Sequence, residues 1–86
     1  MLLYLHLGKN TIVKLDNIVG IFDLDKSTLS KRCRKYLSDK EKSGKITYIT
    51  QKLPKSFVVC MVDGEEIIYV SQLMTETLLK RIKMGT

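Results

Sequence analysis

The residues Phe57-Val-Val-Cys-Met-Val62, followed by Asp63-Gly64 and then by Ile67-Ile-Tyr-Val70, decide the fold of this chain. Two short apolar runs joined by Asp-Gly, one of the strongest short-range turn signals, predict a β-hairpin. Both faces of each run are apolar, whereas an antiparallel strand usually buries one face and leaves the other in water. Something must therefore cover the second face of this hairpin.

Two covers for the second face are compatible with the sequence. One is a second sheet in the same chain, and the other is a neighbouring subunit, because large apolar patches usually mark interfaces. With only two helices expected, we favour the neighbouring subunit. The sequence then predicts a homo-oligomer whose interface includes Phe57, Val59, Met61, Ile67 and Tyr69.

Upstream of this hairpin, the sequence predicts four more strands. Alternating apolar residues on either side of Gly8-Lys9-Asn10 predict a hairpin over residues 2–15. The apolar run 18–24 predicts a third strand, and Gly20 inside it indicates a bulge or a close backbone approach. Residues 46–50 predict a further strand.

The two predicted helices flank the 46–70 region. Leu29, Cys33, Tyr36 and Leu37 have the spacing of one apolar helical stripe, with Ser27 or Thr28 as the N-cap and Gly44 as the terminator. A second, short helix is expected within 71–83. The sequence therefore predicts a single α+β domain over residues 1–86, small and β-rich, with about six mostly antiparallel strands and two helices.

The net charge of +6 is concentrated in one part of the chain. Residues 26–55 contain ten Lys or Arg against two acidic residues, a net +8, whereas each flank carries −1. A basic block between near-neutral flanks indicates a surface for phosphates or another polyanion. The alternative is a solvated helix face that keeps the protein in solution.

The candidate site residues are the basic side chains that lie off the apolar helical stripe or in the loop around the only proline. Their preference for lysine over arginine favours contact with the DNA backbone and readout of DNA shape over direct base reading. The partner expected from these residues is duplex DNA. The predicted DNA-binding residues are Lys31, Arg32, Arg34, Lys35, Lys52 and Lys55.

Catalysis has little support in the sequence, so we expect no enzyme and no cofactor. His6 is the only histidine, and the two cysteines, Cys33 and Cys60, are expected as small core residues in a reducing compartment. Asp23 and Asp25 are expected to act as caps and turn formers. The chain has no Walker motif, no zinc-ligand cluster, no signal peptide and no apolar run long enough to span a membrane, so a cytoplasmic protein is expected.

Several short strings, in order and at matching spacing, resemble the RemA/RemB family of bacterial extracellular-matrix (biofilm) regulators. They extend over nearly the whole chain, from about Tyr4 to Ile82. The strings are Leu7-Gly8 with Ile12-Val13, Ile18-Val19 with Ile21, Lys55-Ser56 with Val58-Val59, Ile68-Tyr69 with Ser71 and Leu73, and Thr77-Leu78 with Lys80-Arg81.

The details look closer to the RemB branch. The RemA branch carries an arginine-rich turn before the penultimate hairpin, and its arginines are the expected DNA contacts. Lys52 and Lys55 match two basic positions of that turn, Leu53 replaces a third, and Asn17 falls near a further one. The pair Lys31-Arg32 matches a basic pair in the RemA helix.

The resemblance implies a transcription-linked regulator that assembles into a closed ring or a similar homo-oligomer. RemA-like members are thought to bend or wrap duplex DNA around the assembled ring. Many modest contacts on one assembly raise the effective concentration and so compensate for weak single sites. The alternative is an oligomeric scaffold or protein-interaction partner, perhaps of a RemA-like protein, with no direct contact to DNA.

Overall fold

The computed structural model describes residues 4–24 and 30–83 of the chain. In this part there are six strands, two α-helices and one 3-10 turn, which confirms the predicted α+β class. In chain order these elements are β1 (Tyr4–Gly8), β2 (Thr11–Lys14), η1 (Leu15–Asn17), β3 (Ile18–Asp23), α1 (Lys31–Lys42), β4 (Ile46–Tyr48), β5 (Ser56–Val62), β6 (Glu65–Ser71) and α2 (Thr75–Lys83).

The apolar hairpin β5–β6 forms the centre of a four-stranded sheet. The strand order is β3-β5-β6-β4, with β4 parallel to β6 and the other neighbours antiparallel. Asp63 and Gly64 both have positive φ, 50° and 82°, as the central pair of a type I′ turn requires. The predicted hairpin is therefore present, and β1 and β2 form a separate two-stranded sheet.

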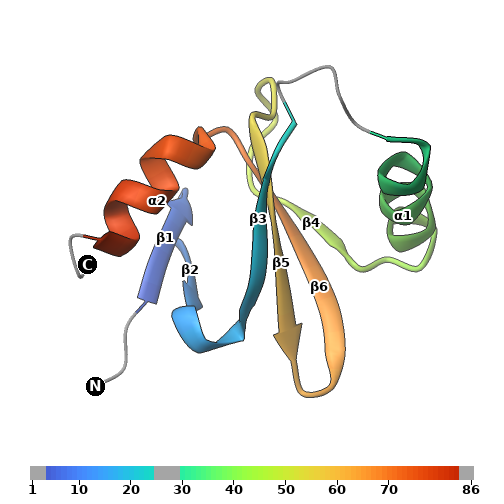
Figure 1. Ribbon diagram of the computed structural model, residues 1–86, viewed down its shortest axis with the longest axis horizontal. Helices are drawn as coiled ribbons and strands as arrows, with labels where there is room; N and C mark the ends of the chain where they lie inside the picture. Colours follow the sequence, from blue (N-terminus) through green and yellow to red (C-terminus); the bar gives the residue numbers. More distant parts are fainter. Residues whose placement is uncertain (1–3, 25–29, 84–86) are drawn as a thin grey trace.

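One face of the four-stranded sheet is covered by β1, β2 and α2. Figure 1 shows α2 and the β1–β2 hairpin on one side of this sheet and α1 on the other. The core on the α2 side is formed by six buried side chains: Leu5, Leu7, Val13, Val58, Cys60 and Leu78. This core joins residues that are far apart in the sequence, because β1 packs against α2.

The opposite face is covered by α1. Phe57, Val59, Ile68 and Val70 are buried there, and Cys33, Tyr36 and Leu37 of α1 pack against them. Phe57 and Val59 keep only 1% and 5% of their exposure within the single chain. Elements of the same chain therefore cover both faces of the hairpin: the second sheet β1–β2 with α2 on one face, and α1 over Phe57 and Val59 on the other.

Element boundaries differ from the sequence predictions at several ends. The N-cap of α1 is Ser30, whose Oγ accepts a hydrogen bond from the backbone N of Cys33 at 3.1 Å. The predicted caps, Ser27 and Thr28, lie outside the described residues, as does Leu29. The last helix, Thr75–Lys83, lies within the predicted range 71–83 and begins four residues into it, because Ser71 is still paired in β6.

Gly20 has the role that the sequence indicated. The register of β3 against β5 shifts between Ile18 and Gly20, which is the predicted bulge. A Cβ at position 20 would lie 2.7 Å from the ring of Phe22. That ring stacks on Phe57 with centroids 5.0 Å apart, so glycine leaves the space in which the two rings meet.

Candidate nucleic-acid interface

The basic helix α1 rests on the sheet through an apolar stripe that is only partly buried. Cys33, Tyr36 and Leu37 are half-buried, and no residue of α1 is fully buried. Gly44, with φ of 71°, follows the helix and supplies the left-handed residue that commonly ends one. The helix is thus well formed locally but is attached to the sheet by modest apolar contact.

Polar contacts supplement this attachment on the β6 side. The Tyr36 hydroxyl donates a hydrogen bond to Glu66 Oε1 at 2.9 Å, and Lys40 Nζ lies 3.1 Å from the same oxygen. Burial, followed by the hydrogen bond to Glu66, raises the pKa of Tyr36 to about 12. Hydrogen bonds from Lys40 and Tyr36 lower the pKa of Glu66 below its usual value. Glu66 therefore anchors the middle of α1 as a carboxylate.

Two further contacts fix the C-terminal end of α1 and the start of β4. The Tyr48 hydroxyl donates to Glu41 Oε1 at 2.9 Å, and this contact raises the pKa of Tyr48. Lys45 Nζ lies 2.7 Å from Glu65 Oε2 and lowers the pKa of that carboxyl. Within the described residues, the ion pair of α1 is therefore the one between Lys40 and Glu66, and Lys31, Arg32, Arg34 and Lys35 form none.

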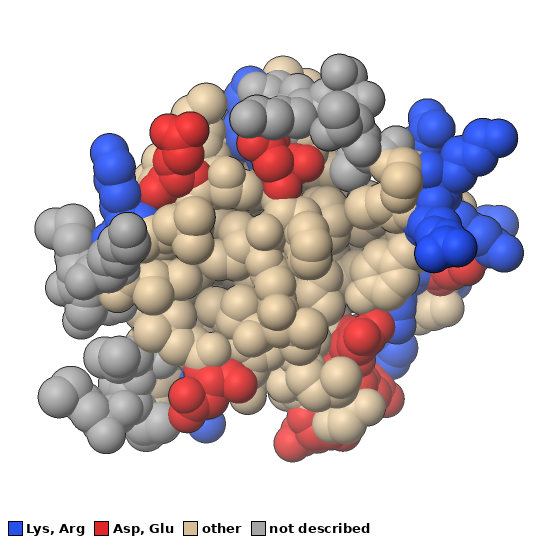
Figure 2. Space-filling model, viewed as in Figure 1, with Lys and Arg blue, Asp and Glu red and all other residues tan. Residues whose placement is uncertain are grey.

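The first five residues of α1 carry four cations. Lys31, Arg32, Arg34 and Lys35 are all exposed, and the first turn contains no acidic residue. In Figure 2, Lys and Arg side chains gather over α1 at one end of the molecule, while the adjoining face is largely uncharged. Because the N-terminus of a helix already has a positive partial charge, these cations lower helix stability and concentrate positive potential.

The second predicted basic element is the loop between β4 and β5. Lys52 is exposed, whereas Lys55 is half-buried and lies beside Ser56, the first residue of β5. The backbone N of Lys55 donates to the carbonyl of Ser71, and its carbonyl accepts from the backbone N of Leu24, both at 2.9 Å. The backbone at Lys55 is therefore fixed by strands on both sides of it.

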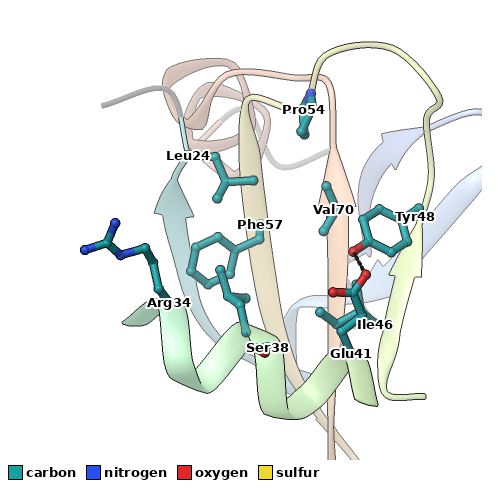
Figure 3. Close-up of a pocket in the computed structure, with 10 residues that line it drawn as sticks. Leu24, Arg34, Ser38, Glu41, Ile46, Tyr48, Pro54, Phe57 and Val70 are labelled. Carbon is teal, nitrogen blue, oxygen red and sulfur yellow. Dashed lines mark hydrogen bonds between the residues drawn. The ribbon is translucent and has the colours of Figure 1, made fainter. Parts of the chain in front are cut away.

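A groove of about 330 Å³ separates the helix from this loop. Its floor is formed by apolar side chains that include Phe57 and Val70, with Arg34 on the helix side and Pro54 on the loop side. Figure 3 shows the guanidinium of Arg34 pointing away from the groove, while the Tyr48 hydroxyl donates its hydrogen bond to Glu41. The helix cations and the loop therefore flank an apolar groove and do not form one continuous cluster around it.

The five expected interface residues do not share one surface. In the register of the hairpin, Phe57 pairs with Val70 and Cys60 with Ile67. Phe57, Val59 and Met61 therefore face α1, whereas Ile67 and Tyr69 lie on the opposite face of the sheet. The sequence signal for this division is the two-residue turn Asp63-Gly64. It pairs Val62 with Glu65, and this register then pairs Cys60 with Ile67 and Phe57 with Val70.

Sequence reasoning missed an exposed apolar corner where β3 and β5 meet on the α1 side. Val19, Phe22 and Met61 are 63%, 46% and 40% exposed. Val19 and Phe22 line a groove with Tyr36 and Val59. The apolar character of 18–24 was visible in the sequence, but the position of β3 at the edge of the sheet was not.

The other chemistry-bearing residues have structural surroundings. His6 is exposed on β1, and its backbone carbonyl accepts a hydrogen bond from Arg81 at 3.1 Å. Burial raises the pKa of the Cys60 thiol to about 11.

Over residues 4–24 and 30–83 no three metal-ligating side chains come together. Neither described helix has the length and apolar character needed to cross a membrane. Asp23 ends β3, and Asp25 lies outside the described residues.

Comparison with known proteins identifies the family. No family model matches the chain. The chain is 37% identical over 79 residues to "Extracellular matrix regulatory protein B" of Bacillus subtilis (strain 168), a match that covers 92% of this chain and 89% of that protein. At this identity and coverage, the resemblance indicated by the short strings is confirmed at the level of the family. The chain belongs to the Rem family of extracellular matrix regulatory proteins.

Proposed function

We propose that this protein is a regulator of extracellular-matrix genes that binds the phosphate backbone of duplex DNA. The observation that carries the proposal is the arrangement of four cations in the first five residues of α1, with no acidic residue in the first turn. This arrangement opposes the usual charge preference at a helix N-terminus. Cations that oppose this preference on an exposed helix are expected where they are needed for binding.

The lysine side chains of this surface favour contact with the DNA backbone over reading of individual bases. Lys31 and Lys35 are one helical turn apart, so they lie on the same exposed side of α1. Lysine acts as a point charge for phosphate, and each phosphate neutralised releases counterions. Lys52, on the other side of the groove, adds a second contact to the same polyanion. Sequence preference would then come from DNA shape.

The experiment is a fluorescence-anisotropy titration of a labelled duplex at about 50 mM and about 200 mM salt, where phosphate-driven binding falls steeply. The variant Lys31→Glu with Lys35→Glu is compared with Lys42→Glu with Lys80→Glu. Lys42 and Lys80 are exposed and lie outside the proposed site, and the two pairs lower the net charge equally. We expect loss of binding in the first variant only. An equal loss in both would show that net charge alone drives association.

We also propose that the protein acts as a homo-oligomer, with contact between copies at the corner formed by Val19, Phe22 and Met61. Val19 and Phe22, exposed on the edge strand β3, and Met61, exposed on the adjacent strand β5, support this, because an edge strand also presents unpaired backbone groups. Analytical ultracentrifugation of Val19→Glu against Leu79→Glu, a half-exposed position on α2, tests the assignment. Dissociation in Leu79→Glu and not in Val19→Glu would place the contact on α2.

The alternative function is that of a scaffold or a partner of a RemA-like protein, with no DNA contact of its own. A stable oligomer without affinity for duplex DNA at about 50 mM salt would favour it. Leu53, which stands where the RemA branch carries a basic residue, supports placing this chain nearer the RemB branch. The same titration therefore separates this alternative from the DNA-binding function.

A further inference from the structure

Leu53 is the most exposed large apolar side chain in the described part of the protein. It is 71% exposed and belongs to neither core cluster. It lies between the exposed Lys52 and Pro54, in the loop that joins β4 to β5. Pro54 lines the groove beside α1 (Figure 3), whereas Leu53 lines none of the grooves described above.

The loop that carries Leu53 is held in place from both ends. Thr50, which is buried, donates from Oγ1 to Gln72 Oε1 at 2.9 Å and accepts from the backbone N of Lys52 at 3.0 Å. On the other side, the Lys55 backbone pairs with Ser71 and Leu24. Proline at position 54 fixes one further backbone dihedral. Leu53 is therefore presented by a preorganised loop, which lowers the conformational entropy lost on binding.

An apolar side chain held beside a cation matches one mode of DNA recognition. Proteins that bend DNA insert Leu, Ile, Phe, Met or Pro between base pairs from the minor groove, while neighbouring cations hold the phosphates. The apolar wedge replaces part of the lost base stacking and leaves the duplex kinked. A lysine alone at this loop would hold phosphate equally well without a projecting leucine.

We propose that Leu53 inserts into the minor groove of duplex DNA and partly unstacks one base step, with Lys52 on the adjacent phosphate. This inference rests on the proposed function, since it requires that the protein binds duplex DNA. It adds a deformation of the DNA that phosphate contacts from α1 do not by themselves produce. The preferred steps are the flexible pyrimidine–purine ones, such as TA, because these unstack most easily.

The test uses the full chain and a duplex with 2-aminopurine at a central TA step, labelled at its ends for energy transfer. Wild-type protein is expected to raise the 2-aminopurine fluorescence and the energy transfer together. Leu53→Ala is expected to bind roughly tenfold more weakly, a part of the benefit of burying a leucine side chain, and to produce neither signal. Its salt dependence should be unchanged, because no phosphate contact is lost.

Two further variants test whether unstacking depends on the apolar character of residue 53, on the branched shape of leucine or on a charge at this position. Leu53→Met, which keeps an apolar side chain of similar length, is expected to retain both signals. Leu53→Lys is expected to bind with a steeper salt dependence and without unstacking. All three substitutions are at an exposed position, so folding should be unaffected, and far-UV circular dichroism checks this.

Each outcome supports or overturns the proposal. Binding by wild-type protein without any rise in 2-aminopurine fluorescence overturns the wedge and leaves the DNA-binding function standing. No binding to any duplex at about 50 mM salt overturns both. If Leu53→Ala loses affinity for vesicles of anionic and neutral phospholipid but behaves like wild type on DNA, the partner of Leu53 is a lipid surface and the proposal fails.

Discussion

The two faces of the four-stranded sheet are covered in different ways. On one face, β1, β2 and α2 enclose a core in which Leu5, Leu7 and Leu78 are fully buried. On the other, α1 has no fully buried residue and is flanked by grooves on both sides. The first cover is apolar, and the second depends in part on hydrogen bonds to Glu66 and Glu41.

This difference indicates that the α2 face mainly stabilises the fold, whereas the α1 face carries the proposed DNA-binding surface. The α2 face supplies a densely packed core, in which the loss of a side-chain contact lowers the stability of the fold. The α1 face can therefore carry a cationic helix whose charges lower its own stability. The predictions below test that separation, from the largest expected effect to the smallest.

Truncating one leucine on each face gives the largest contrast. Leu78→Ala should lower the free energy of unfolding by about 2–5 kcal/mol, because a fully buried side chain leaves a cavity. Leu37→Ala, on the half-buried stripe of α1, should lower it by only about 1 kcal/mol, because less apolar area is returned to water. Urea denaturation measures both. Equal losses would mean that the two faces are packed alike.

Removing one buried hydroxyl should have the next largest effect. Ser71 Oγ donates to the carbonyl of Leu7 at 2.8 Å and accepts from the backbone N of Leu73 at 3.0 Å. Ser71→Ala leaves the carbonyl of Leu7 and the partly buried backbone N of Leu73 without this partner, and should lower the free energy of unfolding by about 1–3 kcal/mol. Ser43→Ala, at the exposed end of α1, is the control and should change it by less than about 0.5 kcal/mol. A comparable loss at Ser43 would contradict the contrast between the faces.

Reversing one charge at the start of α1 should stabilise the protein. Lys31→Glu places an acidic residue in the first turn and one helical turn before Lys35, which should raise the free energy of unfolding by about 0.3–1 kcal/mol. Lys42→Glu makes the same change of charge in the last turn and should lower it by a similar amount. Thermal unfolding at low salt measures the difference. If Lys31→Glu destabilises the protein, α1 does not carry a stability penalty for its cations.

The pH dependence of the α1 face should be the smallest effect, because Glu66 is partly exposed and solvent screens its ion pair with Lys40. Since the folded-state pKa of Glu66 is lowered, its stabilising contribution is present above its usual pKa and is lost as the pH falls through the lowered value. The raised pKa of Tyr36 works in the opposite direction: its contribution is lost as the pH rises toward about 12.

NMR chemical shifts can follow the two faces separately during an acid titration. The α1 amides should move before those of α2, and Glu66→Gln should remove the part that follows the Glu66 carboxyl. Glu76→Gln, at an exposed position in the first turn of α2, is the control. A titration of the α1 amides that is the same in Glu66→Gln as in the wild type would show that this carboxylate does not anchor the helix.

Local patterns in the sequence predicted most of the helices and strands but not which of their residues share one face of the sheet. Asp63-Gly64 located the central hairpin, Gly20 indicated the bulge, and the spacing of Cys33, Tyr36 and Leu37 gave the apolar stripe of α1. These signals act through neighbouring residues, so they can be read in a linear sequence. The five predicted interface residues lie on two faces of the sheet, a division that follows from the pairing register set by the turn.

The sequence by itself determined the fold class, the basic block and the family, because each depends on residue type and spacing along the chain. Only the tertiary structure decided which residues remain exposed. It buried Phe57 and Val59 beneath α1 and left Val19 and Phe22 at an edge. It also separated the helix cations from the loop of Leu53 by a groove. The physical reason is that exposure depends on which elements pack together, and those contacts join positions distant in the chain.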